Sequence, residues 1–347
     1  MRQFLKILCL AIIAGKLFTF VQIPLPWTLG PITAVSLYSL KTGQRVYWPI
    51  KIRNVALIVL GYAMGRPFTI ETGYKIIEQL PLMLIATVIT VLAGIIVGYI
   101  TYKRTGISLA SCLLGCVPGG LSQMVVLAGE MKGTDQTAVT IMQTVRMLSV
   151  VFSVPFLTMH FLHDGNPLLA EAASHVLPPT FNDIALYTAV SIIGAFIAKL
   201  IKLPTPFMLG PIIMTACFIM LTGLTAPIVP TLYLNIAQVL VGIYIGASIN
   251  LGKIKNYHGL MPCLLGGVAF VLIISLCTGY LIVQLTGMTF VTGFLSTSPG
   301  GVAEMGITAL IVGADIATMT AYQLARLLFI MLCFPYIAKF LLRFTTK

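Results

Sequence analysis

Two arginines stand in otherwise apolar stretches of the chain, and their positions suggest an anion site. Arg146 and Arg326 each follow an aspartate, Asp135 or Asp315, by eleven residues. Eleven residues make about three helical turns, so each Asp and Arg share a face, with the arginine about 16 Å along the helix. A guanidinium at that depth of a membrane is costly and usually marks a transport pathway or an internal partner.

Glutamine, glutamate and aspartate side chains are further candidates for the site that these arginines suggest. Gln143 and Gln323 precede the two arginines by three residues and supply further amide donors. Glu304 stands where the first half of the chain has Gln123, and a carboxylate at an unwound segment suits Na⁺ or proton coupling. Asp135 and Asp315 are further candidates for ion coupling. The alternative is structural, with Glu304 pairing an arginine inside the protein, and the sequence leaves both options open.

A Pro-Gly-Gly triplet interrupts two apolar segments, at Pro118–Gly120 and again at Pro299–Gly301. Such a break frees backbone groups that lipid cannot satisfy, so it belongs inside protein or beside a wet cavity. The helix that follows begins with bare N–H groups and a positive dipole end, which is a common site for anions. The alternative is a packing kink, but two breaks at equivalent places favour a site. The predicted substrate-binding residues are Pro118, Gly119, Gly120, Ser122, Gln123, Arg146, Pro299, Gly300, Gly301, Glu304, Gln323 and Arg326.

The elements that position these residues occur twice. Residues 113–146 recur as 295–326, residues 24–32 recur as 204–212, and residues 54–65 recur as 235–246. Three blocks in one order indicate an internal duplication. We therefore expect a first transmembrane repeat at 1–162, a polar linker at 163–181 and a second transmembrane repeat at 182–347.

The composition restricts the fold class. Hydrophobic residues make up 58% of the 347 residues and charged residues 9%, which predicts an all-α polytopic membrane protein. Basic residues alternate between equivalent loops of the two halves, as inverted repeats produce. Each repeat should hold five transmembrane helices plus the PGG-broken or re-entrant segment, with both termini cytoplasmic. The net charge of +12 then follows from the positive-inside rule, and no nucleic acid is implied. The seven cysteines lie in apolar runs without metal spacing, and no catalytic motif occurs, so neither an enzyme nor a cofactor is expected.

The duplicated PGG…GxD…QxxR blocks and the LPxPxxLGPI-like segments carry a family resemblance. They resemble the AbrB-duplication family of bacterial inner-membrane proteins over nearly the whole chain. Its members are labelled ammonia monooxygenases or transcriptional regulators, yet the sequence has neither an oxygenase-type metal constellation nor a DNA-reading domain. The stretch 114–120 is also similar to the broken-helix motif of sodium/bile-acid symporters. In that motif Ser-Asn follows the glycines, whereas Ser122-Gln123 and Ala303-Glu304 stand here, which leaves sodium binding open.

These features together predict a secondary transporter of a small organic anion in the bacterial inner membrane. The substrate would bind between the two PGG turns near the bilayer midplane, with Na⁺ or H⁺ as the candidate coupling ion. The competing hypothesis is a membrane-embedded regulatory or partner protein without transport activity. The sequence does not name the substrate, and it leaves the oligomeric state, a homodimer among the options, open.

Overall fold

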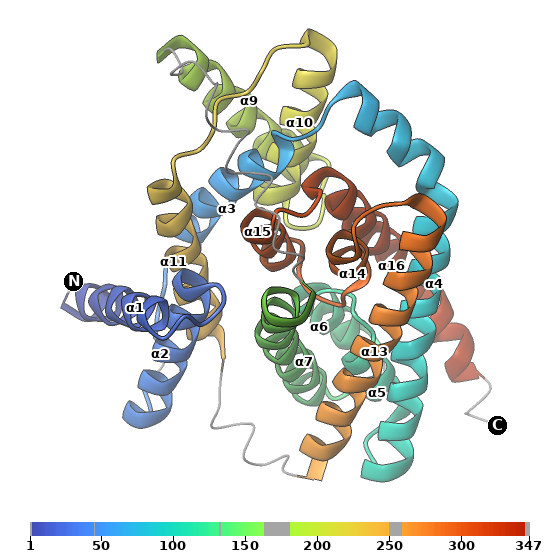
Figure 1. The fold of residues 1–347 in the computed structure, drawn as a ribbon. Helices are drawn as coiled ribbons and strands as arrows, with labels where there is room; N and C mark the ends of the chain where they lie inside the picture. The colour runs from blue at the N-terminus through green and yellow to red at the C-terminus, as the bar shows by residue number, and fades with distance from the viewer. Residues whose placement is uncertain (1, 45, 132, 163–180, 250–258, 344–347) are drawn as a thin grey trace. The chain divides into compact units, whose positions relative to one another are not determined.

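The computed structural model describes residues 2–44, 46–131, 133–162, 181–249 and 259–343, and every regular element among them is helical (Figure 1). The first half contains α1 (Arg2–Phe20), α2 (Pro26–Thr42), α3 (Ile50–Gly65), α4 (Ile70–Thr105), α5 (Leu109–Cys116), α6 (Leu121–Glu130), α7 (Gln136–Leu157) and the short π-helical turn η1 (Thr158–Leu162). The second half contains α9 (Phe181–Leu200), α10 (Pro206–Thr222), α11 (Thr231–Ser248), α13 (Met261–Thr286), α14 (Phe290–Thr297), α15 (Val302–Val312) and α16 (Ile316–Arg343). The order and approximate lengths of the helices therefore repeat once along the chain.

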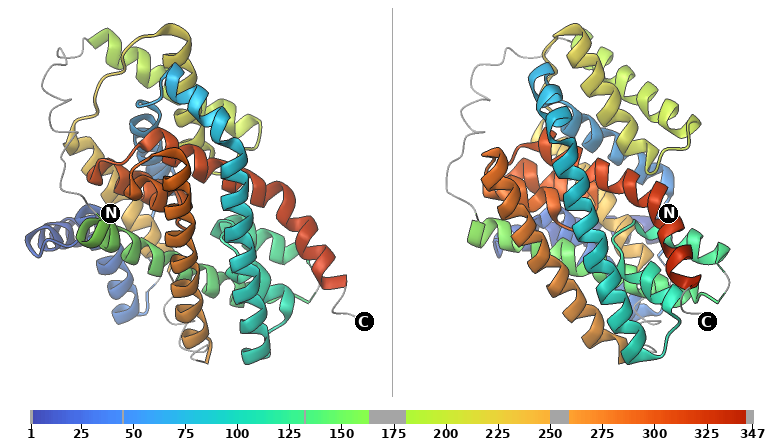
Figure 2. Two further views of the ribbon diagram at one scale, coloured as in Figure 1. Left: turned by 45° about the vertical axis from the view of Figure 1, so that its right-hand side comes forward. Right: turned by 90° about the vertical axis from the view of Figure 1, so that its right-hand side faces the viewer.

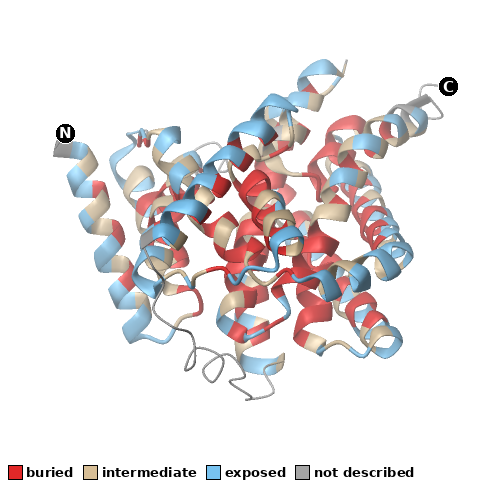
Figure 3. Cartoon of the chain, turned by 90° about the horizontal axis from the view of Figure 1, so that it is seen from above, coloured by how far each residue is buried: buried red, intermediate tan, exposed pale blue. Residues whose placement is uncertain are grey.

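Seven of the helices in the described ranges are long and apolar enough to cross a membrane. They are α1, α4, α7 with its η1 extension, α9, α11, α13 and α16. The longest is α4, with 36 residues, drawn in cyan in Figure 2. In Figure 3 many helices carry buried residues on one side and exposed residues on the other. Exposed isoleucine, leucine and phenylalanine side chains are common, as expected where lipid rather than water covers the protein. The protein is an all-α polytopic membrane protein.

The chain packs into two compact units, and each unit takes helices from both halves. Unit 1 comprises Met1–Ile76, Met159–Leu251 and Gly306–Ala317, and unit 2 comprises Ile77–Thr158, Gly252–Met305 and Thr318–Lys347. This division follows packing, whereas the predicted boundaries at 1–162, 163–181 and 182–347 follow the duplication. The repeat boundaries and the inversion of the two repeats stay predictions.

In unit 1 the third helix of each half packs against the second helix of the other half. Each contact is made at a pair of glycines spaced four residues apart. Helix α3 lies on α10, where a Cβ on Gly61 would come within 2.6 Å of the Met208 carbonyl oxygen. Helix α11 lies on α2 in the same way, and a Cβ on Gly242 would come within 2.7 Å of the Thr28 carbonyl oxygen. Gly65 and Gly246 make the same close approach one turn further on, as small residues permit in membrane helices.

The turns that lead into α2 and α10 share an unusual backbone. Gln22 and Leu25 have φ angles of 59° and 49°, and Lys202 and Thr205 at the matching places have 57° and 42°. Residues other than glycine seldom adopt this left-handed conformation. Its recurrence at equivalent positions shows that the duplicated halves share local geometry as well as sequence.

In unit 2 the short helices α5 and α14 are enclosed by longer ones. Gly94 and Gly98 of α4 approach the backbone of α5, and Gly279 of α13 approaches the backbone of α14 at Gly293. Apolar side chains of α4, α5, α7 and α13 form one core cluster, and those of α4 to α7 and α16 form another. The two PGG breaks directly follow α5 and α14, so both lie in this enclosed region.

Candidate functional site

The two PGG breaks fold alike. Helix α5 has eight residues and ends before Pro118, and α14 has eight residues and ends before Pro299. Eight helical residues span about 12 Å, far less than the roughly 30 Å of a bilayer core. A tight turn follows each helix, in which the Gly119 N–H donates to the Val117 carbonyl and the Gly300 N–H to the Ser298 carbonyl, both at 2.9 Å. Helices α6 and α15 begin immediately afterwards.

Two buried glutamines satisfy carbonyls that the breaks leave free. The Gln143 side-chain amide donates to the carbonyl oxygens of Leu114 and Val117, at 2.7 and 2.8 Å. At the matching place, Gln323 donates to the carbonyl oxygens of Leu295 and Ser298, at 2.7 and 3.2 Å. Neither glutamine is accessible to solvent. Their amide N–H groups thus stabilise the ends of α5 and α14, because an unpaired carbonyl there would be costly in lipid.

Arg326 binds the second turn. Its Nη1 donates to the Ser298 carbonyl oxygen at 2.5 Å and to the Thr297 carbonyl oxygen at 3.3 Å. Its Nη2 donates to the Gly300 carbonyl oxygen at 3.0 Å and to the Gln323 side-chain oxygen. The side chain is only 5% exposed.

Arg146 reaches the same turn from the first half of the chain. Its Nη1 donates to the Pro299 carbonyl oxygen at 2.8 Å, and its Nη2 donates to the Gln143 side-chain oxygen at 2.7 Å. The two guanidinium groups therefore bind three consecutive carbonyls, those of Ser298, Pro299 and Gly300. The Nε of Arg146 is buried, and none of the described residues accepts a hydrogen bond from it.

Neither guanidinium forms an ion pair within the part of the chain that the structure describes. The hydrogen bonds of both arginines end on backbone carbonyl and glutamine amide oxygens. These dipoles replace hydration but leave the positive charge without a contacting anion. The predicted structural pairing of an arginine with Glu304 is not among these contacts.

Glu304 and Gln123 occupy matching positions over the last glycine of each turn. A Cβ on Gly301 would overlap the Glu304 carboxylate, and a Cβ on Gly120 would overlap the Gln123 side-chain oxygen. Gly120 also has a φ angle of +82°, which favours glycine, and no such angle occurs at Gly301. Glu304 is 8% exposed and lies in the first turn of α15, where a negative charge complements the helix dipole.

The remaining predicted residues lie at helix starts. Asp135 caps α7, and its carboxylate accepts from the N–H groups of Thr137 and Ala138 at 2.8 and 3.2 Å. Asp315 stands at the matching place before α16. Ser122 lies in the first turn of α6, and its side chain is outside the described set. The ion-coupling and substrate roles of all these residues stay predictions.

The free space beside Arg146 is small. A cavity of about 20 Å³ lies between Arg146, Gly115, Met142 and Pro299. That volume holds about one water molecule, so no organic anion fits there in this conformation.

Comparison with known proteins gives one family match and two relatives that align with nearly the whole chain. Residues 3–342 match the family described as "Transition state regulatory protein AbrB". The chain is 27% identical to "Putative regulator AbrB" of Escherichia coli (strain K12) over 334 residues, which cover 95% of this chain and 94% of that protein. It is 24% identical to "Uncharacterized protein YhjN" of Bacillus subtilis (strain 168) over 343 residues, which cover 92% of this chain and 88% of that protein.

Proposed function

The chain belongs to the AbrB family, and we propose that it is a secondary transporter that moves a small organic anion across the bacterial inner membrane. The observation that carries the proposal is the meeting of Arg146 and Arg326 at one backbone turn, where each guanidinium is solvated only by neutral oxygens. The proposal includes the substrate site at the PGG turns and both termini in the cytoplasm.

Electrostatics favours an anion at this place. Two guanidinium groups that bind neighbouring carbonyls repel each other, and an anion between them and the adjacent helix N-termini relieves that repulsion. Helices α6 and α15 begin at Leu121 and Val302, directly after the turns, and add partial positive charge. The buried Nε of Arg146 supplies an N–H donor that no group in the described part of the chain uses.

Glu304 is the proposed coupling residue. Its carboxylate lies in the first turn of α15, shortly after Gly301. The negative charge of this carboxylate opposes the binding of an anionic substrate. Protonation of Glu304 removes that repulsion, so the protonated protein binds the anion more tightly and carries a proton with it. Binding of Na⁺ to the same carboxylate is the alternative coupling route.

Access to the site requires a change of conformation. The space of about 20 Å³ beside Arg146 excludes an organic anion, as expected for an occluded state of an alternating-access transporter. A substrate would enter in another state, with Gly119 and Gly300 allowing its close approach to the turn backbone.

A membrane-embedded regulatory protein is the second candidate, and two observations favour it. The family and one relative carry regulator names. The hydrogen bonds of Arg326 to Thr297, Ser298 and Gly300 are also those that a purely structural arginine makes. A protein of this kind would need the arginines for folding alone.

Uptake by purified protein in proteoliposomes, measured with a panel of radiolabelled carboxylates, separates the two candidates. Arg146→Lys and Arg326→Lys keep the charge but lose the planar fork, so the apparent affinity should fall while the folded protein remains. Arg104→Lys, at an exposed position near the end of α4, is the matched control and should transport normally. Absence of carboxylate uptake by the wild type, together with loss of folded protein in both arginine variants, would favour the regulator.

A further inference from the structure

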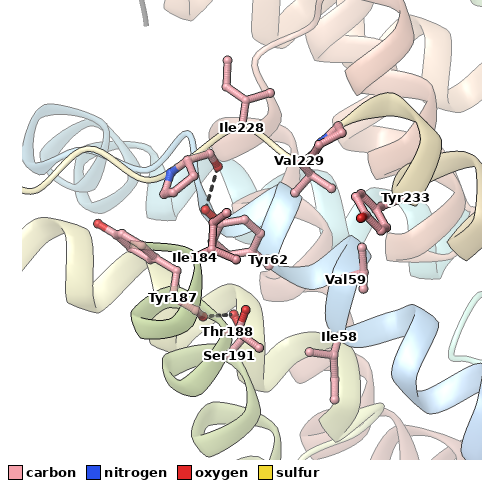
Figure 4. Close-up of a pocket in the computed structure, with 12 residues that line it drawn as sticks. Ile58, Val59, Tyr62, Ile184, Tyr187, Thr188, Ser191, Ile228, Val229 and Tyr233 are labelled. Atoms are coloured by element: carbon pink, nitrogen blue, oxygen red, sulfur yellow. Dashed lines mark hydrogen bonds between the residues drawn. The ribbon is translucent and has the colours of Figure 1, made fainter. Parts of the chain in front are cut away.

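Unit 1 contains a cavity of about 360 Å³ that is remote in sequence from the PGG turns. It lies between α3, α9, the start of α11 and the segment 227–230 that leads into α11 (Figure 4). This volume is within the range of small-molecule sites in proteins. No motif in the sequence predicted this cavity.

The equivalent place in the duplicated half is filled by aromatic side chains. The repeat offset places Phe4 at the position of Ile184 and Trp48 at the position of Val229. The rings of Phe4 and Trp48 stack there at 4.6 Å with an interplanar angle of 5°, and Trp48 is 5% exposed. The core cluster around them includes most of the counterparts of the residues that line the cavity. The cavity therefore exists because two aromatic residues of one half are aliphatic in the other.

Hydroxyl groups also distinguish the two places. The cavity has five hydroxyl-bearing residues where the filled counterpart has only aliphatic ones: Tyr62 for Ile243, Tyr187 for Ile7, Thr188 for Leu8, Ser191 for Ala11 and Tyr233 for Ile52. A void left by imperfect packing would not explain five differences from aliphatic to hydroxyl-bearing residues. The pattern indicates a site rather than a void left by chance.

Three of these hydroxyls are used within the protein. The Tyr62 hydroxyl donates to the Pro227 carbonyl oxygen at 2.6 Å, and the Tyr187 hydroxyl donates to the Leu224 carbonyl oxygen at 3.2 Å. The Ser191 hydroxyl donates to the Tyr187 carbonyl oxygen at 2.9 Å. Arg66 adds a bond from its Nε to the Ala226 carbonyl oxygen at 2.9 Å. The segment over the cavity is thus held in place by side chains of α3 and α9, and the cavity is preformed.

The lining determines the chemistry of the occupant. No charged side chain lines the cavity among the described residues, and its walls are mainly isoleucine, valine, proline and tyrosine rings. The hydroxyls of Thr188 and Tyr233 have no hydrogen bond to another described residue and are left for a ligand. The occupant is therefore uncharged within the cavity, largely apolar, and able to accept one or two hydrogen bonds.

The edge of the cavity connects with the lipid-facing surface. Ile184 is 49% exposed and Tyr233 58% exposed. Helix α9 is long and apolar enough to span the membrane, and it continues from Ile184 with exposed Ile192, Ile193 and Phe196. We propose that the cavity binds one hydrocarbon chain of a membrane lipid, with the ester oxygens of that lipid near Thr188 and Tyr233.

Photocrosslinking tests the proposal on the wild-type protein. The purified protein is reconstituted in lipid nanodiscs that contain a phospholipid with a diazirine in one acyl chain. After illumination, the labelled peptides are identified by mass spectrometry. Label should concentrate on residues 184–191 and 227–233. Uniform labelling of all lipid-facing helices, with no excess in these segments, would overturn the proposal.

Paired variants test the cavity itself. Ile184→Phe with Val229→Trp installs the side chains of the filled counterpart and should abolish the excess label and the lipid retained in native mass spectrometry. Phe4→Ile with Trp48→Val opens the filled counterpart in the first half of the chain, which lacks the hydroxyl groups. This variant should leave the label in 184–191 unchanged. Thr188→Val with Tyr233→Phe preserves the size of the cavity and should weaken lipid retention, which keeps the test informative if the filled variant misfolds. Retention of a water-soluble small molecule in place of lipid would contradict the assignment to lipid.

Discussion

Replacement of Arg326 by methionine should destabilise the protein, and Glu304→Gln should not reverse the loss. The variant loses two good charge-assisted hydrogen bonds to the carbonyl oxygens of Ser298 and Gly300, and a third to the Gln323 side-chain oxygen. At about 1.5–3 kcal/mol each these three bonds contribute about 4.5–9 kcal/mol. Removal of a guanidinium from the membrane interior recovers about 2.5–3.5 kcal/mol. The net loss is therefore about 1–6.5 kcal/mol in the free energy of unfolding.

The neighbouring donors limit the damage. The Ser298 carbonyl keeps the amide of Gln323 at 3.2 Å, and the Thr297 carbonyl keeps the hydroxyl of Ser275 at 3.2 Å. The Gly300 carbonyl and the Gln323 side-chain oxygen both lose the donor that Arg326 gives them. Arg146→Met should cost less still, because Arg146 makes one bond to the turn and its Nε is unpartnered.

Unfolding titrations in mixed detergent micelles measure these differences for the wild type, Arg326→Met, Glu304→Gln and the double variant. Arg104→Met, at an exposed position, serves as the control for loss of a positive charge. If Arg326 and Glu304 formed a buried ion pair, Arg326→Met would cost about 3–5 kcal/mol and the double variant would recover much of it. Such a recovery would refute the assignment of Arg326 to the turn carbonyls.

Further predictions follow from the packing and the charges. Gly61→Ala should destabilise the protein because the new Cβ would lie 2.6 Å from a backbone oxygen, whereas Gly266→Ala, with open space around it, should be neutral or stabilising by up to about 1 kcal/mol in the same titration. Gly301→Leu should abolish uptake and leave folded protein in the membrane, and loss of folded protein would instead indicate packing. Uptake should strengthen as the pH falls and Glu304 gains its proton, and Glu304→Gln should remove that dependence in a pH series. Reporter fusions should place the linker 163–180 outside and the C-terminus in the cytoplasm, and finding both on one side would exclude inverted repeats.

The sequence alone was sufficient for the features that depend on local chemistry. Its composition predicted membrane helices because too few charges remain to cover a soluble surface. The PGG triplets predicted the two breaks because a proline followed by two glycines interrupts a helix. The apolar run in α4 does not mark its full length, since polar first turns continue the helix to Ile70.

The tertiary structure alone decided which groups meet. The bond from Arg146 to Pro299 joins residues 153 positions apart, and no local pattern specifies such a partner. Helices α3 and α11 each pack against a helix of the other half, and this packing also depends on residues far apart in the sequence. The same holds for the cavity beside Tyr62. A duplicated sequence makes each position a candidate for two equivalent environments, and only the packed helices determine which environment each side chain occupies.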